Sequence, residues 1–487
     1  SFINGTDWKN EVTAIDRMAK LTKEDIVAFA NKYLKEDNYA VIYKKQGKDP
    51  NEKKMTKPEI TPIITNRDVA SPFLVEVQES AVKPIEPVFL DYQKDMSQLK
   101  AKSDIPILYK QNVANDLFQL IYVFDMGNNH DKALGTAFDY LEYLGTSDMT
   151  PEELKSEFYR LACTFYVSPG NERTYVVLSG LNENMPAAVQ LFEKLLADAQ
   201  VNKEAYTNMT SDILKARSDA KLNQGQNFSR LMSFAMYGPK SPATNLLTEA
   251  ELTNMNPQEL VDRIHNQNSY KHRILYYGPS SSKDLLATIN QYHQVPAALK
   301  DIPAGNEYSY LETPVTKVLV APYDAKQIYM AQISNLDKKY DPAIEPIRAL
   351  YDEYFGGGMN SIVFQEMRET RGLAYSAWAS IMPPSYLKYP YVLRTQIATQ
   401  NDKMIDAVTT FNDIINNMPE SEAAFKLAKD GLTNRLRTER IIKGDIIWSY
   451  INAQDLGQNV DPRIKLYNDI QNMSLKDIVD FQKQWVK

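Results

Sequence analysis

A nine-residue pattern of polar and hydrophobic positions occurs three times along the chain, at Leu21–Phe29, Met255–Arg263 and Met473–Phe481. In each copy the second residue can cap a helix, an acid follows three positions later, and two apolar residues come next. A side-chain oxygen that accepts free backbone N–H groups, with an acid near the positive end of the helix dipole, is typical of a helix start. The pattern therefore predicts three helices, the first over Lys23–Leu34.

The interval between the copies indicates how the chain is divided. Their acids lie 234 and 218 residues apart, far more than the roughly 20–50 residues of a solenoid repeat. Strand-like runs follow the first two copies, at Tyr39–Tyr43 and Arg273–Tyr277. We interpret each copy as the closing element of a domain-sized unit, so that residues 1–45 are expected to be the tail of a unit whose body is absent.

Proline interrupts the pattern after the first copy. Residues 46–102 contain many Lys and Glu residues together with Pro50, Pro58, Pro62, Pro72, Pro84 and Pro87. Proline at this density blocks regular structure and favours extended chain. The composition therefore predicts a linker over 46–102, and a second, shorter break from Pro279 to Pro314 separates a unit at 103–290 from a unit at 291–487.

These two units show a similar order of strand-like and helix-like runs. The first has predicted strands at Ile105–Tyr109, Leu117–Phe124, Cys163–Val167 and Thr174–Leu178, and helices at Lys132–Tyr143 and Met185–Ala199. The second has predicted strands at Lys317–Val320, Gln327–Ile333, Ala374–Ser380 and Tyr391–Ala398, and helices at Ala343–Tyr354 and Ser361–Thr370. Because strands and helices mix without strict alternation, the pattern predicts an α+β fold of two similar domains, each a mixed or antiparallel sheet with helices on one face.

Composition and charge narrow the classes of function. The chain is 43% hydrophobic and 24% charged, as in globular proteins, and its net charge of −7 argues against a nucleic-acid partner. No run of about 18 uncharged apolar residues occurs, so the sequence predicts no transmembrane segment. The single cysteine, Cys163, rules out an internal disulfide and is expected to be a buried residue of a strand.

The most specific segment runs from Phe355 to Ser376 and contains Gly356-Gly357-Gly358. It lacks the Lys-Ser/Thr that follows the last glycine of a phosphate loop, and a helix rather than a strand is predicted before it. We instead expect a turn, then a helix capped by Asn360 or Ser361 that points Ile362, Phe364 and Met367 inward. Gly372 is predicted to end this helix in a left-handed conformation, and a strand is expected to begin at Leu373-Ala374-Tyr375.

This segment, Gly-Gly-x3-Ser-x2-Phe-x3-Arg-Glu-x2-Gly-Leu-Ala-Tyr-Ser, resembles the signature of the pitrilysin-like zinc metallopeptidases, the insulysin and mitochondrial processing peptidase type. Both units and the leading tail resemble the family more weakly, so that the resemblance covers nearly the whole chain. The chain would then be the C-terminal half of such a protein. It implies the pitrilysin/LuxS-like metallohydrolase fold, in which two halves joined by a linker enclose a chamber. It also implies that 1–45 belong to a preceding domain, 103–290 to a degenerate domain and 291–487 to a substrate-binding domain.

Two residues of the segment match the pair that holds substrate in that family. Arg368 and Tyr375 have the family's seven-residue spacing, and the resemblance implies that both bind peptide. A guanidinium and a phenol are strong donors that do not need to titrate at neutral pH, and they can stabilise charge on a carbonyl oxygen. The structural alternatives are a surface ion pair of Arg368 with Glu369 or Glu366, and a half-buried strand position for Tyr375.

The zinc motif of the family, H-x-x-E-H, is degenerate here. The matching stretch places Asp139 and Tyr143 at the histidine positions and keeps only Glu142. The family's third ligand is a glutamate roughly 75 residues on, but residues 208–221 contain none. A catalytic zinc needs about three protein ligands. The four histidines show no metal-binding spacing either: His130, His265, His272 and His293. We therefore predict that this chain binds no metal and holds no catalytic residue, and that zinc is held by a missing half or a partner.

The sequence thus predicts the non-zinc half of a zinc metallopeptidase that is inactive alone. Its partners would be a peptide substrate and an N-terminal half or zinc-bearing subunit. The alternative is a catalytically inactive scaffold or peptide-binding subunit with the same fold. The compartment stays open, with a weak preference for a bacterial envelope or periplasm that rests on the single cysteine and the family's bacterial members.

Overall fold

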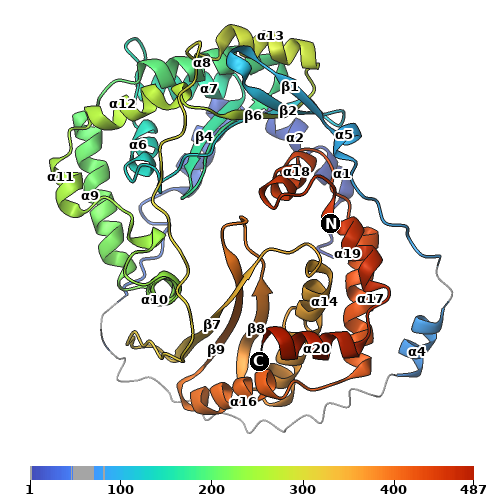
Figure 1. Ribbon diagram of the computed structural model, residues 1–487. Helices are drawn as coiled ribbons and strands as arrows, with labels where there is room; N and C mark the ends of the chain where they lie inside the picture. The colour runs from blue at the N-terminus through green and yellow to red at the C-terminus, as the bar shows by residue number, and fades with distance from the viewer. Residues whose placement is uncertain (1–2, 45–46, 48–70, 81–82, 487) are drawn as a thin grey trace. The chain divides into compact units, whose positions relative to one another are not determined.

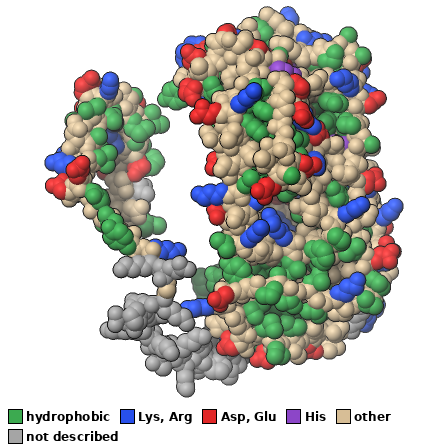
Figure 2. Space-filling model, turned by 90° about the vertical axis from the view of Figure 1, so that its left-hand side faces the viewer, with side chains coloured by type: hydrophobic (Ala, Val, Ile, Leu, Met, Phe, Trp, Pro, Cys, Tyr) green, Lys and Arg blue, Asp and Glu red, His purple; other side chains and the backbone are tan. Residues whose placement is uncertain are grey.

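The computed structural model describes residues 3–44, 47, 71–80 and 83–486, and it separates into a small unit, Ser1–Thr61, and a larger unit, Pro62–Lys487 (Figure 1). The small unit contains three helices among its described residues: α1 (Trp8–Val12), α2 (Ala14–Met18) and α3 (Lys23–Tyr33). Thr22 and Asp25 form the predicted capping box at the start of α3. Hydrophobic side chains remain on the surface of this unit (Figure 2).

The larger unit contains two β-sheets. The first has six strands in the order β1-β2-β6-β3-β5-β4, and only the β2–β6 pair is parallel. Its strands are β1 (Ser97–Lys100), β2 (Pro106–Gln111), β3 (Leu117–Phe124), β4 (Cys163–Pro169), β5 (Thr174–Leu181) and β6 (Arg273–Gly278).

Both faces of this sheet are covered because successive side chains of a strand point to opposite sides. Leu120, Tyr122 and Phe124 of β3 point into a core shared with α6 (Leu134–Leu141), α8 (Met185–Asp198), α12 (Gln258–Asn266) and α13 (Ser282–Tyr292). Ile121 and Val123 point to the other side, where they pack against α18 (Asp445–Asp455). A helix from the C-terminal part of the chain therefore completes the packing of the first sheet.

The second sheet has three antiparallel strands in the order β7-β9-β8. They are β7 (Gln327–Lys339), β8 (Ala374–Met382) and β9 (Pro390–Gln400). Tyr391, Leu393 and Ile397 of β9 point into a core formed with α14 (Glu345–Phe355), α16 (Met404–Asn416), α17 (Glu422–Thr438) and α20 (Leu475–Trp485). Arg394 and Gln396 alternate with them and lie on the opposite face.

The remaining helices connect these layers. In the first half of the larger unit they are α7 (Pro151–Arg160), α9 (Lys203–Ala220), α10 (Gln224–Tyr237) and α11 (Glu249–Asn254), and near the end α19 (Pro462–Ile470). Helix α10 reaches the second sheet, where Phe228 packs edge-on against Tyr329 of β7 at 5.7 Å between ring centroids. A partly buried ion pair, from Arg173 of the turn before β5 to Asp455 of α18 at 2.6 Å, also links the first sheet to the C-terminal part of the chain.

The predicted α+β class is confirmed, and most predicted strands and helices form. Two predicted strands are wrong: Tyr39–Tyr43 and Lys317–Val320 form no ladder. Val318 and Val320 are instead exposed. A strand needs a neighbour to bond its N–H and C=O groups. The matching run after the second copy of the repeat, β6, has two such neighbours, whereas these two segments have none among the described residues.

The stretch assigned to a linker also contains structure. Helix α4 (Pro72–Glu79) and helix α5 (Tyr92–Asp95) lie within it, and β1 is the edge strand of the first sheet. Leu90, Tyr92 and Met96 are buried beside α18. Composition did not predict that these residues are buried. The prolines precede them, and their side chains are buried by contacts with residues far along the chain. Cys163 is buried on β4, as expected.

Candidate substrate-binding site

The segment that carries Arg368 and Tyr375 folds as a turn, a short helix and a strand. Helix α14 ends at Phe355, α15 (Ile362–Phe364) continues as a turn of π-helix, η5 (Gln365–Thr370), and β8 begins at Ala374. Ser361 is the residue that caps α15, with its hydroxyl accepting from the N–H of Phe364. Ile362 and Met367 are buried as predicted, whereas Phe364 is only partly buried. Arg368 lies in the π-helical turn, and such turns are frequent at functional sites.

Two glycines of the segment are required by backbone geometry. A Cβ on Gly356 would lie 2.2 Å from the carbonyl oxygen of Ala379, so only glycine lets the end of α14 approach β8 this closely. Gly372 has a φ of +55°, which confirms the predicted left-handed end of the helix. The glycine-rich turn therefore serves packing, and it positions the strand that carries Tyr375.

A β-bulge sets the direction of Tyr375. In the ladder between β8 and β9, Ala374 pairs with Thr399 and Ser376 pairs with Ala398, so that Tyr375 is the extra residue. Because of this insertion, Tyr375 and Ser376 are both exposed, and regular alternation resumes with Ala377 buried. Tyr375 is 78% exposed, so the half-buried alternative for this residue is wrong.

Arg368 and Tyr375 are brought together by this arrangement. The guanidinium carbon of Arg368 lies 5.0 Å from the ring centre of Tyr375 and 5.0 Å from that of Phe364. Its Nε lies 3.4 Å from a carboxylate oxygen of Glu369, so the ion-pair alternative exists together with the stacking. Cation–π contacts of this kind restrain the guanidinium without consuming its donors. The result is a cation and a phenol, side by side and accessible to solvent.

The residues at the degenerate zinc motif do not fit a zinc site. Asp139 and Glu142 lie at the end of α6, and Tyr143 directly follows; all three side chains are exposed. Partial desolvation and the neighbouring Glu142 carboxylate raise the pKa of Asp139. In the part of the chain that is described, no group of three or more His, Cys, Asp or Glu side chains converges. Zinc prefers Cys, His and carboxylate ligands, and a tyrosine at a histidine position does not supply one.

Sequence reasoning missed one buried polar cluster, because its members lie up to 100 residues apart. His293 Nδ1 lies 2.7 Å from Glu193 Oε1, and its Nε2 lies 2.8 Å from His272 Nε2. His272 Nδ1 in turn lies 2.7 Å from the carbonyl oxygen of Tyr270. All three side chains are at most 7% exposed. The cluster joins α8, the start of β6 and the end of α13, and it is enclosed in the first core rather than open to a ligand.

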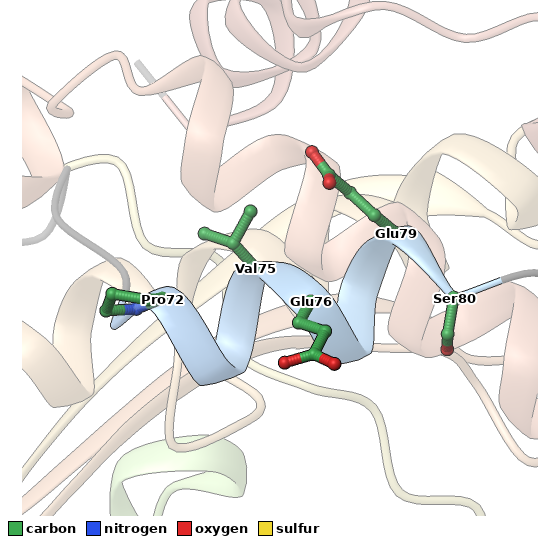
Figure 3. Close-up of a pocket in the computed structure, with 5 residues that line it drawn as sticks. All are labelled: Pro72, Val75, Glu76, Glu79 and Ser80. Atoms are coloured by element: carbon green, nitrogen blue, oxygen red, sulfur yellow. The ribbon is translucent and has the colours of Figure 1, made fainter.

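A surface hollow beside α4 does not bring reactive groups together. It is lined by Pro72, Val75, Glu76, Glu79 and Ser80, all from one helix. Figure 3 shows that the carboxylates of Glu76 and Glu79 point to different sides of this helix. The hollow therefore offers no convergent chemistry, and the pair on η5 and β8 remains the candidate site.

Comparison with known proteins shows which families this chain resembles. Residues 274–432, which include Arg368 and Tyr375, match the family model described as the peptidase M16 inactive domain. An uncharacterised zinc protease of Rickettsia felis is 20% identical over 263 residues, 51% of this chain and 60% of that protein. The non-peptidase homolog YmxG of Helicobacter pylori is 23% identical over 405 residues, 78% of this chain and 89% of that protein.

Solved structures share the fold. A peptidase M16 inactive domain from Pseudomonas fluorescens superposes with a TM-score of 0.60 at 16% identity, over 80% of this chain and 94% of that one. The periplasmic protease PqqL of Escherichia coli superposes with a TM-score of 0.63 at 13% identity, over 98% of this chain but 50% of that one. The chain thus spans 60% of the Rickettsia protein and half of PqqL. The resemblance to the pitrilysin-like family is confirmed: residues 274–432 match the peptidase M16 inactive-domain model, and the chain has the fold of these solved structures.

Proposed function

We propose that this chain is the peptide-binding, non-zinc half of an M16 zinc metallopeptidase. Arg368 and Tyr375 would donate hydrogen bonds to a carbonyl oxygen of the bound peptide. Zinc would be contributed by an N-terminal half or a partner chain, since the motif at Asp139, Glu142 and Tyr143 does not fit the metal. Neither half alone should hydrolyse peptides efficiently, because a reaction is accelerated only when the groups that bind its transition state act together.

The observation that carries this proposal is the stacking of Arg368 between Phe364 and Tyr375, with both donors exposed. A purely structural role would not need an accessible phenol at a strand bulge. Strand packing is satisfied by Ala374 and Ala377 on either side. A preorganised pair of donors, in contrast, stabilises developing charge without reorganising when the reaction occurs.

The second candidate function is a non-catalytic peptide-binding or scaffold subunit. It is favoured by the similarity to YmxG, which is named a non-peptidase homolog and of which this chain covers 89%. The two functions differ in whether a zinc-bearing partner completes the site. They do not differ in fold, so only an activity measurement separates them.

The test is cleavage of a quenched fluorescent peptide of about ten residues by this chain mixed with the separately expressed zinc-bearing half. We expect activity only in the mixture. Arg368→Ala should lower kcat/KM by about 100-fold or more, and Tyr375→Phe, which keeps the ring but removes the hydroxyl, by about 10–100-fold. Arg435→Ala is the matched control, because Arg435 is a more exposed arginine that pairs with Glu353 on α14.

Three other outcomes would decide against parts of this proposal. An assembled mixture that cleaves nothing would favour the scaffold function. Equal loss in Arg368→Ala and Arg435→Ala would assign no special role to Arg368. Cleavage by this chain alone would contradict the assignment of zinc to another half.

A further inference from the structure

A second arginine lies on the same sheet as Tyr375. Arg394 is in the middle strand β9, on the face that points away from the second core. Its guanidinium carbon lies 5.2 Å from the ring centre of Trp378 on β8. Its Nη2 donates to Gln396 Oε1 at 3.1 Å and lies 3.9 Å from the sulfur of Met232 on α10. The side chain is therefore half-buried among uncharged groups.

The charge of Arg394 is not neutralised. Among the described residues no acid pairs with Arg394, and its Nε is buried without a hydrogen-bond partner. Burial alone lowers the pKa of Arg394, with no compensating acid. Burying part of a cation without an anion destabilises the protein, and each unpaired buried donor adds to the cost. An anion supplied by a bound ligand would offset this cost.

The position of this arginine relative to Tyr375 fits a bound peptide. Trp378 pairs with Gln396, and Ser376, next to Tyr375, pairs with Ala398. The guanidinium contacts Trp378 and Gln396, so it lies about two residues from Ser376 along the strands. At ~3.3 Å per residue this is roughly 7–10 Å from the level of Tyr375, the span of two or three residues of an extended peptide.

We propose that Arg394, stacked on Trp378, binds a carboxylate of the peptide two or three residues from the carbonyl held by Arg368 and Tyr375. The carboxylate is that of an acidic side chain or of a free C-terminus. The inference rests on the proposed peptide-binding function and adds a preference to it. Arginine suits this role because its planar fork matches a carboxylate, and because the face of Trp378 holds the fork in place.

The test is binding of fluorescent peptides to this chain, measured by anisotropy. Two matched pairs of peptides distinguish the two sources of the carboxylate. One pair differs by Glu or Gln at a single scanned position, and the other by a free or amidated C-terminus. For the wild type, one carboxylate peptide should bind on the order of tenfold more tightly than its neutral match. Arg394→Gln should remove that preference and leave the Kd of the neutral peptide within about twofold.

Three variants separate this role from general effects. Arg394→Lys keeps the positive charge but loses the planar guanidinium, and it should retain only part of the preference for the carboxylate peptide. Arg371→Gln removes an arginine three residues after Arg368 that already contacts Glu366 and Thr410, and it should leave the preference unchanged. Arg368→Ala should weaken both members of a pair equally. Circular dichroism and the unfolding midpoint verify that each variant is folded.

The outcomes distinguish a failure of the proposed role of Arg394 from a failure of the proposed peptide-binding function. A carboxylate preference that survives in Arg394→Gln and Arg394→Lys would overturn the role of Arg394 and leave peptide binding intact. Equal weakening of acidic and neutral peptides by Arg394→Gln would also overturn it, since that result describes a structural residue. A wild-type chain that binds none of the peptides would overturn both proposals.

Discussion

The side chains around Arg368 decide how its guanidinium is presented. Phe364 and Tyr375 each contact it at 5.0 Å, and Glu369 pairs with the Nε edge at 3.4 Å. This leaves the cation restrained and still 41% exposed. Sequence could name Arg368 and Tyr375 from the motif. It could not show that Phe364, expected to point inward, would be the platform beneath the arginine.

The histidine pair in the first core shows how buried polar groups constrain one another. Nδ1 of His272 faces a carbonyl oxygen, so it must donate, and its Nε2 is then left to accept from His293. One proton therefore lies between His293 and Glu193. Burial and the neighbouring His293 lower the pKa of His272 to about 4, which agrees with a neutral His272.

This network predicts that the protein loses stability in mild acid. Unfolded, His272 would bind a proton near its ordinary pKa of about 6.5. Folded, it stays neutral down to about pH 4. The unfolded state therefore binds more protons between these values, and the free energy of unfolding should fall by about 3 kcal/mol as pH drops from 6.5 to 4. Urea unfolding of the larger unit at pH 7, 5.5 and 4.5 measures this slope.

Two substitutions identify the residue responsible. His272→Gln should remove most of the slope, whereas His265→Gln should keep it, because His265 is an exposed residue of α12. An unchanged slope in His272→Gln would assign the acid sensitivity to other groups, such as the many surface carboxylates.

At the scale of elements, the end of α14 is locked against β8. Asp352 accepts from the N–H of Ile381 at 2.9 Å and from the hydroxyl of Ser380 at 2.9 Å. Gly356 allows the backbone to pass next to Ala379. The strand that carries Tyr375 is thus positioned by a helix that precedes it by about twenty residues.

A pair of glycine substitutions tests this close contact. Gly356→Ala should lower the free energy of unfolding by about 3 kcal/mol or more, since its Cβ would lie 2.2 Å from backbone that cannot move freely. Gly431→Ala is the matched control in helix α17, where a Cβ meets nothing within 4 Å. It should raise stability by about 0.5–1 kcal/mol through helix propensity. Chemical denaturation of both variants compares them directly, and equal effects would contradict the contact.

At the scale of the whole molecule, the three copies of the nine-residue pattern have different surroundings. Leu260 in α12 and Ile478 in α20 are fully buried, each against a domain core. The matching residue of the small unit, Ile26, is 58% exposed, and Phe29 is 62% exposed where Phe481 is 5% exposed. The same local sequence therefore forms the same helix with and without a core to cover it.

Among the helices described, none combines the length and apolar content that crossing a bilayer requires.

This contrast predicts that the same change, isoleucine to aspartate, has a large effect in one copy and a small effect in another. Ile478→Asp should destabilise the larger unit by about 4 kcal/mol or more, because it leaves a cavity and buries a charge. Ile26→Asp should change that unfolding transition by less than about 0.5 kcal/mol. Urea denaturation followed by tryptophan fluorescence measures both. A large loss in Ile26→Asp, or a small loss in Ile478→Asp, would contradict this difference between the two copies.

The amino-acid sequence by itself determined the local structure: caps, periodicity and glycines placed most helices and strands, and the motif named Arg368 and Tyr375. These features depend on neighbours within a few residues. Only the tertiary structure decided which runs became strands, because a strand requires a partner, and Tyr39–Tyr43 and Lys317–Val320 have none in the described part of the chain. It also decided the outward turn of Tyr375 at a bulge, the burial of His272 with His293, and the unpaired charge of Arg394. Each of these depends on pairing between segments distant in the chain, which no local pattern encodes.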